Sequence, residues 1–490
     1  MRLRAAAIAA LITLTGCAEV TQPDPVQEVT SGAVDLFEQE ISWSDCGDQF
    51  ECASVAVPLD WNEPEEKLIS IALMRKAGSE NLVPLFINPG GPGSGAISWM
   101  RDGYDSTGSA YLRENFQVIA FDPRGVGDST AVTCSDMGLK DKLLYSPSPY
   151  GFGTEEDLAY LADVAERFGQ SCQGDISTGY FNTQQTARDL DLLRELVDSE
   201  LLNYLGYSYG TELGANYASL FPENVGLFIL DGAVDPTLGP DAALLAQIAG
   251  FDMAMEAYLE NCFAQVSCPV PQDMNEAKDT IGSILRNLER DTLPTDYDRD
   301  LSLSAAIAGI IVTLYSEGSW PYLSAGIEDA LKGDGTMLLL LADFYNDRDS
   351  EGGYLTNLVE ANSAIACADE KTYPVNGEDL TDAIINASPV FGKYFAYGDG
   401  SCFGWPEGIG NTVLDFNVTP NTKPLIIGTT GDPATPYQHA IVLSELLKGS
   451  DLLTFEGEGH TAYGSNPCVD SVVDSYLAGE PLDKLRCSSR

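Results

Sequence analysis

The chain has 490 residues, 44% of them hydrophobic, with 26 Lys and Arg against 74 Asp and Glu, for a formal net charge of −48. This length and apolar content predict one enlarged globular domain with an insertion, or two domains. Such an acidic surface repels phosphate backbones and excludes nucleic acid as a partner. The acidic residues serve solubility after export or adapt the chain to high salt, and both interpretations stay open.

Residues 1–17 predict a signal for export. A short basic start, MRLR, precedes the apolar stretch AAAIAALITL, which is too short to span a bilayer. The following LTGC resembles a bacterial lipobox and predicts that Cys17 becomes a lipid-modified N-terminus. The alternative is an ordinary secretory signal, in which case the protein is released. Residues 18–40 are polar and predict a flexible tether.

The cysteine content agrees with an extracytoplasmic location. Removing Cys17 from the 11 cysteines leaves ten, an even number that favours disulfides in an oxidising space. Pairing in chain order gives Cys46–Cys52, Cys134–Cys172, Cys262–Cys268, Cys367–Cys402 and Cys468–Cys487. Ten cysteines allow roughly a thousand pairings, so the connectivity is open. No C-x-x-C occurs and the chain has 2 His, so we predict no zinc or other metal site.

Strands and helices alternate through most of the chain. The patterns predict antiparallel strands at 54–61 and 68–77, buried strands at 82–88, 116–121, 201–207, 225–231, 422–430 and 450–456, and helices at 182–200, 211–222 and 437–449. This alternation predicts an α/β protein with a mostly parallel sheet. Helical patterns dominate residues 236–410, which we interpret as an insertion between two core parts, 41–235 and 411–490.

A serine stands at a sharp corner of this pattern. GYSYG, residues 206–210, fits G-x-S-x-G between a strand and a helix, the context of a nucleophile elbow. A serine hydroxyl needs a base to take its proton, and of the two histidines His460 lies in a glycine-rich loop after the last strand, whereas His439 lies within a helix. Asp432 follows a buried strand and stands between Ser208 and His460 in chain order. We therefore predict Ser208, Asp432 and His460 as a catalytic triad.

The oxyanion of an acyl-transfer reaction needs fixed N–H donors. The backbone of Tyr209, directly after the nucleophile, is one expected donor. The loop NPGGPGSG, residues 88–95, follows an earlier strand and is the expected source of the second, for which we choose Gly91 over Gly90. The loop lacks the G-K-[ST] of a nucleotide-binding P-loop.

These motifs together resemble the secreted tripeptidyl-aminopeptidase-like and proline-iminopeptidase-like serine peptidases of the α/β-hydrolase fold. The resemblance covers the chain after about residue 40 and rests on NPGGPGSG, FDPRGVGDS, TARDLDLLRELV, NYLGYSYGTELGANYASLFPENV, LDGAVDP, IACAD, GDPATP and GEGHTAYG. It implies an α/β-hydrolase fold with an inserted helical cap, and the same Ser208, Asp432 and His460 triad.

One residue departs from the family pattern. Glu212 stands where members commonly carry Tyr or another large neutral residue. An exopeptidase must recognise a free ammonium, for which a carboxylate provides a charge-assisted hydrogen bond. Glu212 and Asp369 of IACAD are therefore candidate substrate-binding residues, although Glu212 on a solvated helix face needs no function.

The resemblance and the residues predict an extracytoplasmic exopeptidase that releases short N-terminal pieces from peptides with a free N-terminus. We expect no cofactor, and we expect a monomer attached to the membrane by lipid. An esterase or amidase for small molecules could use the same triad. A solute-binding lipoprotein without catalysis is the alternative from another class.

Overall fold

The computed structural model describes residues 36–370, 380–396 and 402–489. Cys17 and most of the expected tether lie outside these residues. Ten strands form one sheet in the order β1-β2-β3-β5-β4-β6-β7-β8-β9-β10. Their bounds are β1 Ser44–Gly47, β2 Phe50–Pro58, β3 Leu68–Lys76, β4 Val83–Asn88, β5 Phe116–Phe121, β6 Leu202–Tyr207, β7 Val225–Asp231, β8 Leu425–Gly431, β9 Asp451–Glu458 and β10 Arg486–Ser488.

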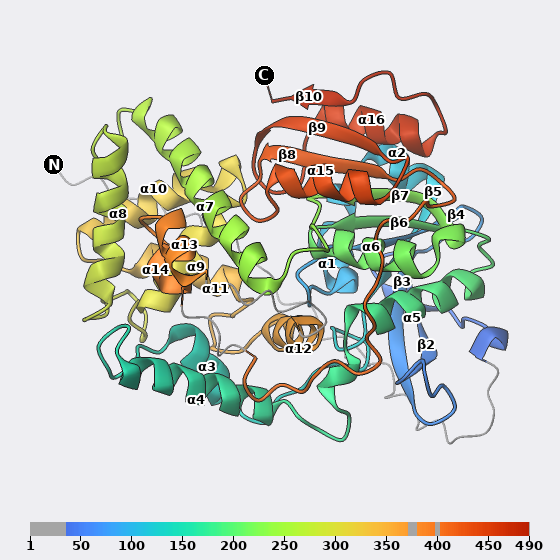
Figure 1. Cartoon of the computed structure of the whole chain (residues 1–490), viewed down its shortest axis with the longest axis horizontal. Helices are drawn as coiled ribbons and strands as arrows, with labels where there is room; N and C mark the ends of the chain where they lie inside the picture. Colours follow the sequence, from blue (N-terminus) through green and yellow to red (C-terminus); the bar gives the residue numbers. More distant parts are fainter. Residues whose placement is uncertain (1–35, 371–379, 397–401, 490) are drawn as a thin grey trace, which may run out of the picture.

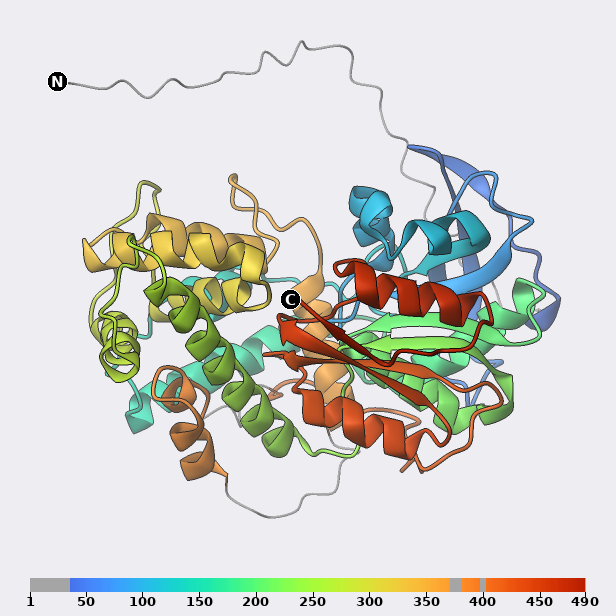
Figure 2. The same cartoon turned by 90° about the horizontal axis from the view of Figure 1, so that it is seen from above.

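The sheet is antiparallel at its start and parallel from β5 onward. β2 pairs antiparallel with β3, and β3 with β5, while β5, β4, β6, β7, β8, β9 and β10 run parallel. All six residues of β5 and of β6 are buried, because helices cover both faces of the sheet (Figure 2). Because parallel strands end at the same edge, the segments after β4, β6, β8 and β9 meet there.

Two helix layers enclose the sheet. One core cluster joins a face of the sheet to α1 Ala96–Gly103, α2 Ala110–Asn115 and α16 Pro467–Leu477. Another joins the opposite face to α5 Thr183–Leu196, α6 Tyr209–Leu220 and α15 Tyr437–Leu446. This doubly covered, mostly parallel sheet is the α/β-hydrolase fold expected from the sequence.

A second, helical part lies beside the sheet (Figure 1). Between β7 and β8 the described chain forms α7 Pro240–Phe263, α8 Met274–Leu288, α9 Leu303–Leu314, α10 Trp320–Leu331, α11 Thr336–Tyr345, α12 Leu358–Glu370, α13 Thr381–Ala387 and α14 Gly392–Phe395. Most of these helices share a hydrophobic core of their own, with members such as Met255, Ile281 and Leu338. We call this part the cap.

Two earlier helices extend the cap. α3 Met137–Tyr145 and α4 Glu155–Ser171 lie with the cap in Figure 1, although they precede β6 in the chain. Lys140 of α3 is buried and forms an ion pair with Glu360 of α12, with an Nζ–Oε2 distance of 2.8 Å. The Lys140 ammonium also lies 3.7 Å from the centre of the Tyr354 ring. These contacts tie α3 to helix α12 of the cap.

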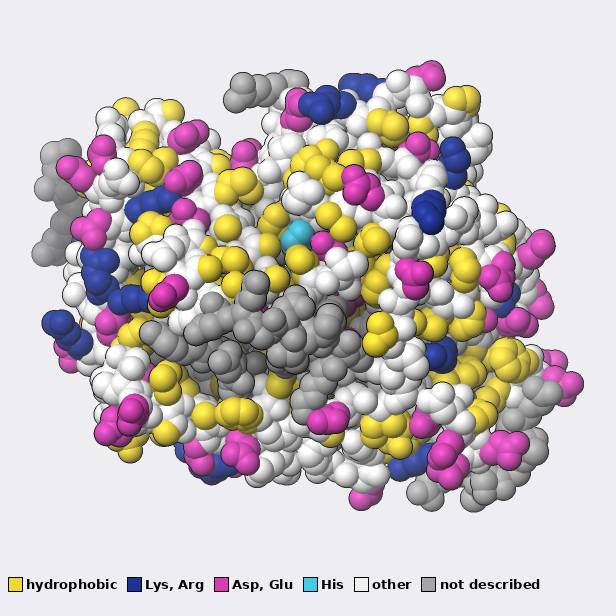
Figure 3. Space-filling view, in the orientation of Figure 1, with side chains coloured by type: hydrophobic (Ala, Val, Ile, Leu, Met, Phe, Trp, Pro, Cys, Tyr) yellow, Lys and Arg dark blue, Asp and Glu magenta, His cyan; other side chains and the backbone are white. Residues whose placement is uncertain are grey.

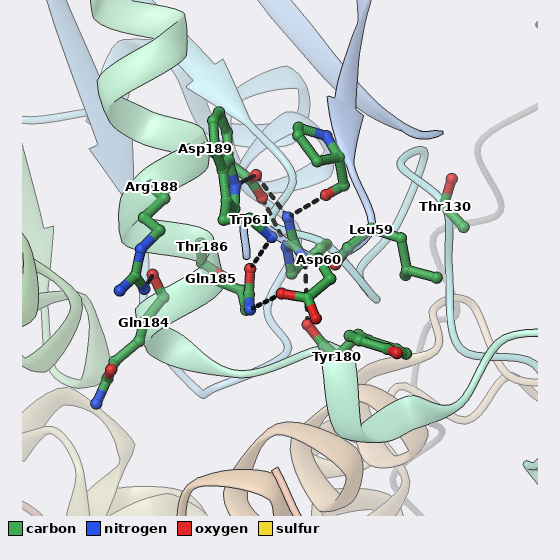
Figure 4. A network of polar contacts seen from close by, with 12 residues as sticks. Leu59, Asp60, Trp61, Thr130, Tyr180, Gln184, Gln185, Thr186, Arg188 and Asp189 are labelled. Atoms are coloured by element: carbon green, nitrogen blue, oxygen red, sulfur yellow. Dashed lines mark hydrogen bonds and ion pairs between the residues drawn. The ribbon is translucent and has the colours of Figure 1, made fainter. Parts of the chain in front are cut away.

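A buried ion pair joins the middle of α5 to the loop after β5 (Figure 4). Arg124, in the loop after β5, is fully buried and donates from Nε and Nη2 to the two carboxylate oxygens of Asp189, at 2.7 and 2.6 Å. The same guanidinium donates to the backbone oxygens of Pro58, Leu59 and Tyr180. Trp61 Nε1 donates to Asp189 at 2.8 Å. Every oxygen and nitrogen of the pair is therefore engaged, as burial of charge requires.

The cysteines of the described residues form five disulfides. The pairs are Cys46–Cys52, Cys134–Cys172, Cys262–Cys268, Cys367–Cys402 and Cys468–Cys487, as the chain-order prediction has them. Such a set is typical of a protein that folds in an oxidising compartment. Among the described helices, none has the length and apolar character needed to cross a membrane. Acidic side chains are scattered over the face in Figure 3 rather than gathered in one patch.

Candidate active site

Ser208 lies at the turn between β6 and α6. β6 ends at Tyr207 and α6 begins at Tyr209, so Ser208 alone makes the reversal, with φ 54° and ψ −124°. A non-glycine residue in such a conformation is strained by roughly 1–3 kcal/mol and is typical of functional sites. Ser208 N–H donates to Asp231 O at 2.9 Å, and the backbone and hydroxyl of Thr211 donate to Ser208 O. These bonds hold the turn in place.

The two glycines that flank Ser208 are needed for space. A Cβ on Gly206 would lie 2.4 Å from Gly210 O, and a Cβ on Gly210 would lie 2.8 Å from Asn88 O. A larger side chain at either position would push the strand and the helix apart. Steric crowding in this fold therefore explains both glycines of the G-x-S-x-G motif, which also stands between a strand and a helix as expected.

Asp432 and His460 form a hydrogen-bonded pair at the same edge of the sheet. His460 Nδ1 lies 2.9 Å from each carboxylate oxygen of Asp432. Asp432 is fully buried and also accepts from the backbone N–H groups of Ala434 and Thr435 and from the Thr435 hydroxyl, all at 2.9 Å. Since the carboxylate accepts, Nδ1 carries the proton and Nε2 of the neutral ring is left as a base.

The charges around His460 favour its protonated form. Burial disfavours charge on the imidazole, but the Asp432 carboxylate and its hydrogen bond, together with Asp231, outweigh burial and raise the pKa of His460 above its usual 6.5. The side chain of His460 is 11% exposed, so it is reachable from outside. A carboxylate that stabilises an imidazolium is what a serine hydrolase needs when the ring takes a proton.

His460 lies next to the Ser208 turn and contacts the cap. The backbone N–H of Ser208 donates to Asp231 O. A Cβ placed on Gly232, the residue after Asp231, would lie 3.0 Å from His460 Cε1. The backbone N–H of His460 donates to Tyr315 O of the cap at 2.9 Å. The Tyr315 and His460 rings pack edge to face, with their centroids 5.4 Å apart. Within the described residues, Ser208 Oγ makes no hydrogen bond to His460 Nε2; in unliganded enzymes such contacts are often long.

The glycine-rich loop lies against the nucleophile. A Cβ on Gly90 (φ 102°) would lie 2.6 Å from Tyr207 O, 2.9 Å from Ser208 Cβ and 3.3 Å from Tyr209 N. Gly90 N–H donates to the Asn88 side chain at 2.9 Å and is thus occupied. No hydrogen bond within the described ranges uses the N–H of Gly91 or of Tyr209. These two groups therefore remain as candidate oxyanion donors.

Asp122 and α12 hold this loop from two sides. Asp122 accepts from Ile97 N, at the start of α1, and from Asp128 N. Burial is the main reason that the pKa of Asp122 is raised to about 6. Asn362 of α12 donates to Pro92 O at 3.0 Å, and a Cβ on Gly93 would lie 2.7 Å from Asn362 N. The cap thus contacts the glycine-rich loop directly, beside the nucleophile.

Asp231 is a site residue that the sequence analysis did not single out, although it stands in LDGAVDP. It is fully buried at the end of β7, and its Oδ2 accepts from the backbone of Ala462 and Tyr463, just after His460. Its Oδ1 has no hydrogen-bond partner among the described residues. Burial raises the pKa of Asp231 to about 6 despite these two bonds. Asp231 thus fixes the loop that carries His460.

The remaining candidates have clear positions. Glu212 and Asp369 line one pocket on the flank of α6, so the structure brings them together. His439 is buried in α15, its Nδ1 has no partner in the described part of the chain, and burial lowers its pKa. Asp432 is hydrogen-bonded to His460, which lies in a loop, and no hydrogen bond within the described part of the chain joins it to His439 of α15. Near the centre of the face in Figure 3, hydrophobic side chains surround a histidine between the cap and the sheet.

Comparison with known proteins agrees with this fold. Residues 83–467 match the model of the alpha/beta hydrolase fold family. Serine protease Hip1 of Mycobacterium tuberculosis is 34% identical over 87% of this chain and 85% of its own. Carboxylesterase B of the same organism is 33% identical over 95% of this chain and 93% of its own. Tripeptidyl aminopeptidase of Streptomyces lividans is 29% identical over 89% and 84%.

The match to the family covers most of the chain, and two relatives that are named as peptidases align over most of their own length. The sheet has the order and the helix layers of this fold. The chain therefore belongs to the α/β-hydrolase fold family, as a serine hydrolase related to its peptidases.

Proposed function

We propose that the protein is an extracytoplasmic serine exopeptidase that releases short N-terminal peptides through Ser208, His460 and Asp432. The observation that supports this most is the Asp432–His460 pair, 2.9 Å apart, beside the strained Ser208 turn. The names of two relatives, serine protease and tripeptidyl aminopeptidase, agree with a peptide substrate. Lipid anchoring through Cys17 remains a prediction from the sequence.

The proposed reaction follows from these positions. Ser208 Oγ attacks the scissile carbonyl carbon while His460 Nε2 takes its proton. The carbonyl oxygen becomes an oxyanion that the N–H groups of Tyr209 and Gly91 would meet. His460 then gives the proton to the leaving amine, and an acyl-enzyme remains on Ser208. Water attacks this ester by the same route in reverse, so the N-terminal piece leaves as a free acid.

The cap supports an exopeptidase rather than an endopeptidase. Tyr315 and α12 lie directly against His460 and the glycine-rich loop, so the site has a wall on its cap side. Cleavage in the middle of a polypeptide needs room for the chain on both sides of the scissile bond, and this wall takes that room on one side. A peptide that enters by its end needs room for a long chain on the other side only.

An esterase is the second candidate, because one relative is named Carboxylesterase B. The two functions separate in one assay that compares a free tripeptide anilide, its N-acetylated form and a short-chain nitrophenyl ester. We expect the free tripeptide anilide to have the highest kcat/KM. Turnover of the ester with no turnover of either peptide would reject the peptidase proposal, and no turnover of any of them by folded protein would favour a solute-binding role.

The pH profile should follow His460. Catalysis needs the neutral imidazole, and its pKa is raised above 6.5. We therefore expect kcat/KM for the free tripeptide anilide to fall about tenfold per unit below a midpoint that lies above 6.5, and to fall again above about pH 8, where the ammonium of the substrate loses its own proton. Measurement between pH 5 and 9 in one ionic strength checks this. A midpoint clearly below 6.5 would contradict the proposed role of Asp432.

A further inference from the structure

One turn of the glycine-rich loop lies between the nucleophile and the cap. Gly90 begins this turn and packs against the nucleophile, and Ser94 N–H closes it by donating to Gly90 O at 3.3 Å. Between them lies Gly91, whose N–H is the proposed second oxyanion donor. Next to it lies Pro92, whose carbonyl oxygen accepts from the side-chain amide of Asn362 at 3.0 Å. A catalytic donor and a contact with the cap are thus neighbours in one turn.

Helix α12 of the cap supports this turn closely. A Cβ on Gly93 would lie 2.7 Å from Asn362 N and 2.8 Å from Leu358 O, so the backbone of α12 packs against the backbone of the turn. Among the described residues, no hydrogen bond other than that of Asn362 joins the cap to residues 90–94. Asn362 is therefore the side chain through which the cap holds the turn.

Helix α12 is itself firmly anchored. Asn357, just before the helix, donates to Gly125 O at 2.9 Å and accepts from Gly127 N at 3.0 Å, both in the loop after β5. Ala361 and Ile365 are buried in the core cluster that α12 shares with α5 and α6. A buried ion pair joins the same helix to α3. An element fixed on several sides can hold a loop in one position.

A contact on Pro92 restrains the N–H of Gly91. The pyrrolidine ring fixes φ of Pro92 at about −65°, so its carbonyl cannot be held without restricting the peptide before it. Gly91 has φ 110° and no side chain, so no packing of its own fixes its orientation. An oxyanion donor is effective only if it already points at the place where charge develops. The direction of the Gly91 N–H therefore depends on how its neighbours are held.

We propose that Asn362 is a positioning residue of the oxyanion hole: by holding Pro92 O, it aims the Gly91 N–H at the oxyanion formed on the substrate. This inference rests on the proposed function and adds to it a residue from the cap. Asn362 itself does not touch the reacting atoms. The cap then has a part in catalysis besides forming a wall of the site.

The test compares Asn362→Ala and Asn362→Asp with the unchanged protein on the free tripeptide anilide. Alanine favours the helix and removes the amide, whereas aspartate keeps the size of the side chain but, when ionised, donates no hydrogen bond. Loss of one oxyanion donor costs about 10²- to 10³-fold in kcat, and a misaimed donor costs part of that. We expect kcat to fall about 10- to 100-fold in both variants, with KM within about twofold.

Asn386→Ala is the matched control. Asn386 lies on the exposed side of α13 in the cap, and its amide also donates to a backbone carbonyl, Asp382 O, at 2.7 Å. The substitution therefore removes the same kind of bond from the same part of the molecule, away from the glycine-rich loop. We expect kcat and KM to stay within about twofold of the unchanged protein.

A transition-state analogue separates positioning from a merely structural role. In the reaction with a tripeptidyl trifluoromethyl ketone, Ser208 Oγ bonds to the carbonyl carbon, His460 takes the proton and the carbonyl oxygen becomes an oxyanion. The matching secondary alcohol binds without this reaction. We expect Ki of the ketone to rise in Asn362→Ala by about the factor by which kcat falls, and Ki of the alcohol to change less than about twofold.

Equal rises in Ki for the ketone and the alcohol would assign Asn362 a structural role and overturn the inference. Unchanged kcat and ketone Ki in a folded Asn362→Ala variant, shown by its melting temperature, would overturn it and leave the proposed function intact. If the unchanged protein cleaves only the nitrophenyl ester, the peptidase proposal is wrong, and kcat for the ester then decides on Asn362. If it cleaves neither substrate, the proposed function and the inference are both wrong.

Discussion

Replacement of Ser208 by alanine is expected to lower kcat by about 10⁴- to 10⁶-fold, with little change in KM. The variant loses the only atom that the proposal places in covalent contact with the substrate. Its backbone should keep the turn, because Ser208 N–H and C=O, and not the hydroxyl, make the bonds to Asp231 and Thr211. Steady-state rates on the free tripeptide anilide measure the effect.

Ser219→Ala provides the control for this substitution. It makes the same chemical change on the same helix, where the hydroxyl donates to Asp415 O at 2.8 Å, far from the turn. We expect its rates to stay within about twofold of the unchanged protein. A Ser208→Ala variant that is folded and retains more than a tenth of the activity would show that another residue is the nucleophile.

The largest effect on stability is expected for Arg124→Met. Methionine fills much of the space but leaves the buried Asp189 carboxylate with Trp61 and without its cation. Breaking a buried ion pair on one side costs about 3–5 kcal/mol, and three backbone oxygens also lose their donor. Denaturant unfolding followed by far-UV circular dichroism measures the free energy of unfolding.

Arg188→Met is the matched comparison for Arg124→Met. Arg188 precedes Asp189 on α5, and its hydrogen bond goes to Gln184 O of the same helix at 3.0 Å. Its side chain lies to the outside of the network in Figure 4. We expect a loss below about 1 kcal/mol. Equal losses for the two variants would mean that the Arg124–Asp189 pair has no special weight in the fold.

The sequence was most informative where one local rule and the chain order agreed. G-x-S-x-G between a strand and a helix predicted the Ser208 turn, and the structure gives its packing cause in Gly206 and Gly210. Alternating residues in 54–61 and 68–77 predicted the antiparallel pair that β2 and β3 form. Asp432 and His460 were placed on loops after successive parallel strands, and such loops must meet at one edge of the sheet.

The packing of helices and loops that are far apart in the sequence could not be predicted from such local patterns. Nothing in the pattern of residues 137–171 shows that α3 and α4 would lie with the cap, because an amphipathic helix does not specify its partner. The contact of Tyr315 O with His460 uses a backbone atom and so leaves no residue-type signal. Asp231 stands in the motif LDGAVDP, but the chain has 74 acidic residues, and nothing in the sequence distinguishes this buried one from the others.

The central claim is that Ser208 is a nucleophile activated by His460. Reaction of the folded protein with a fluorophosphonate, followed by mass spectrometry of its peptides, tests this most directly, because the reagent forms a stable bond only with an activated serine. We predict one adduct, on the peptide that contains Ser208, and its loss in His460→Ala. An adduct on a different serine, or none on folded protein, would contradict it.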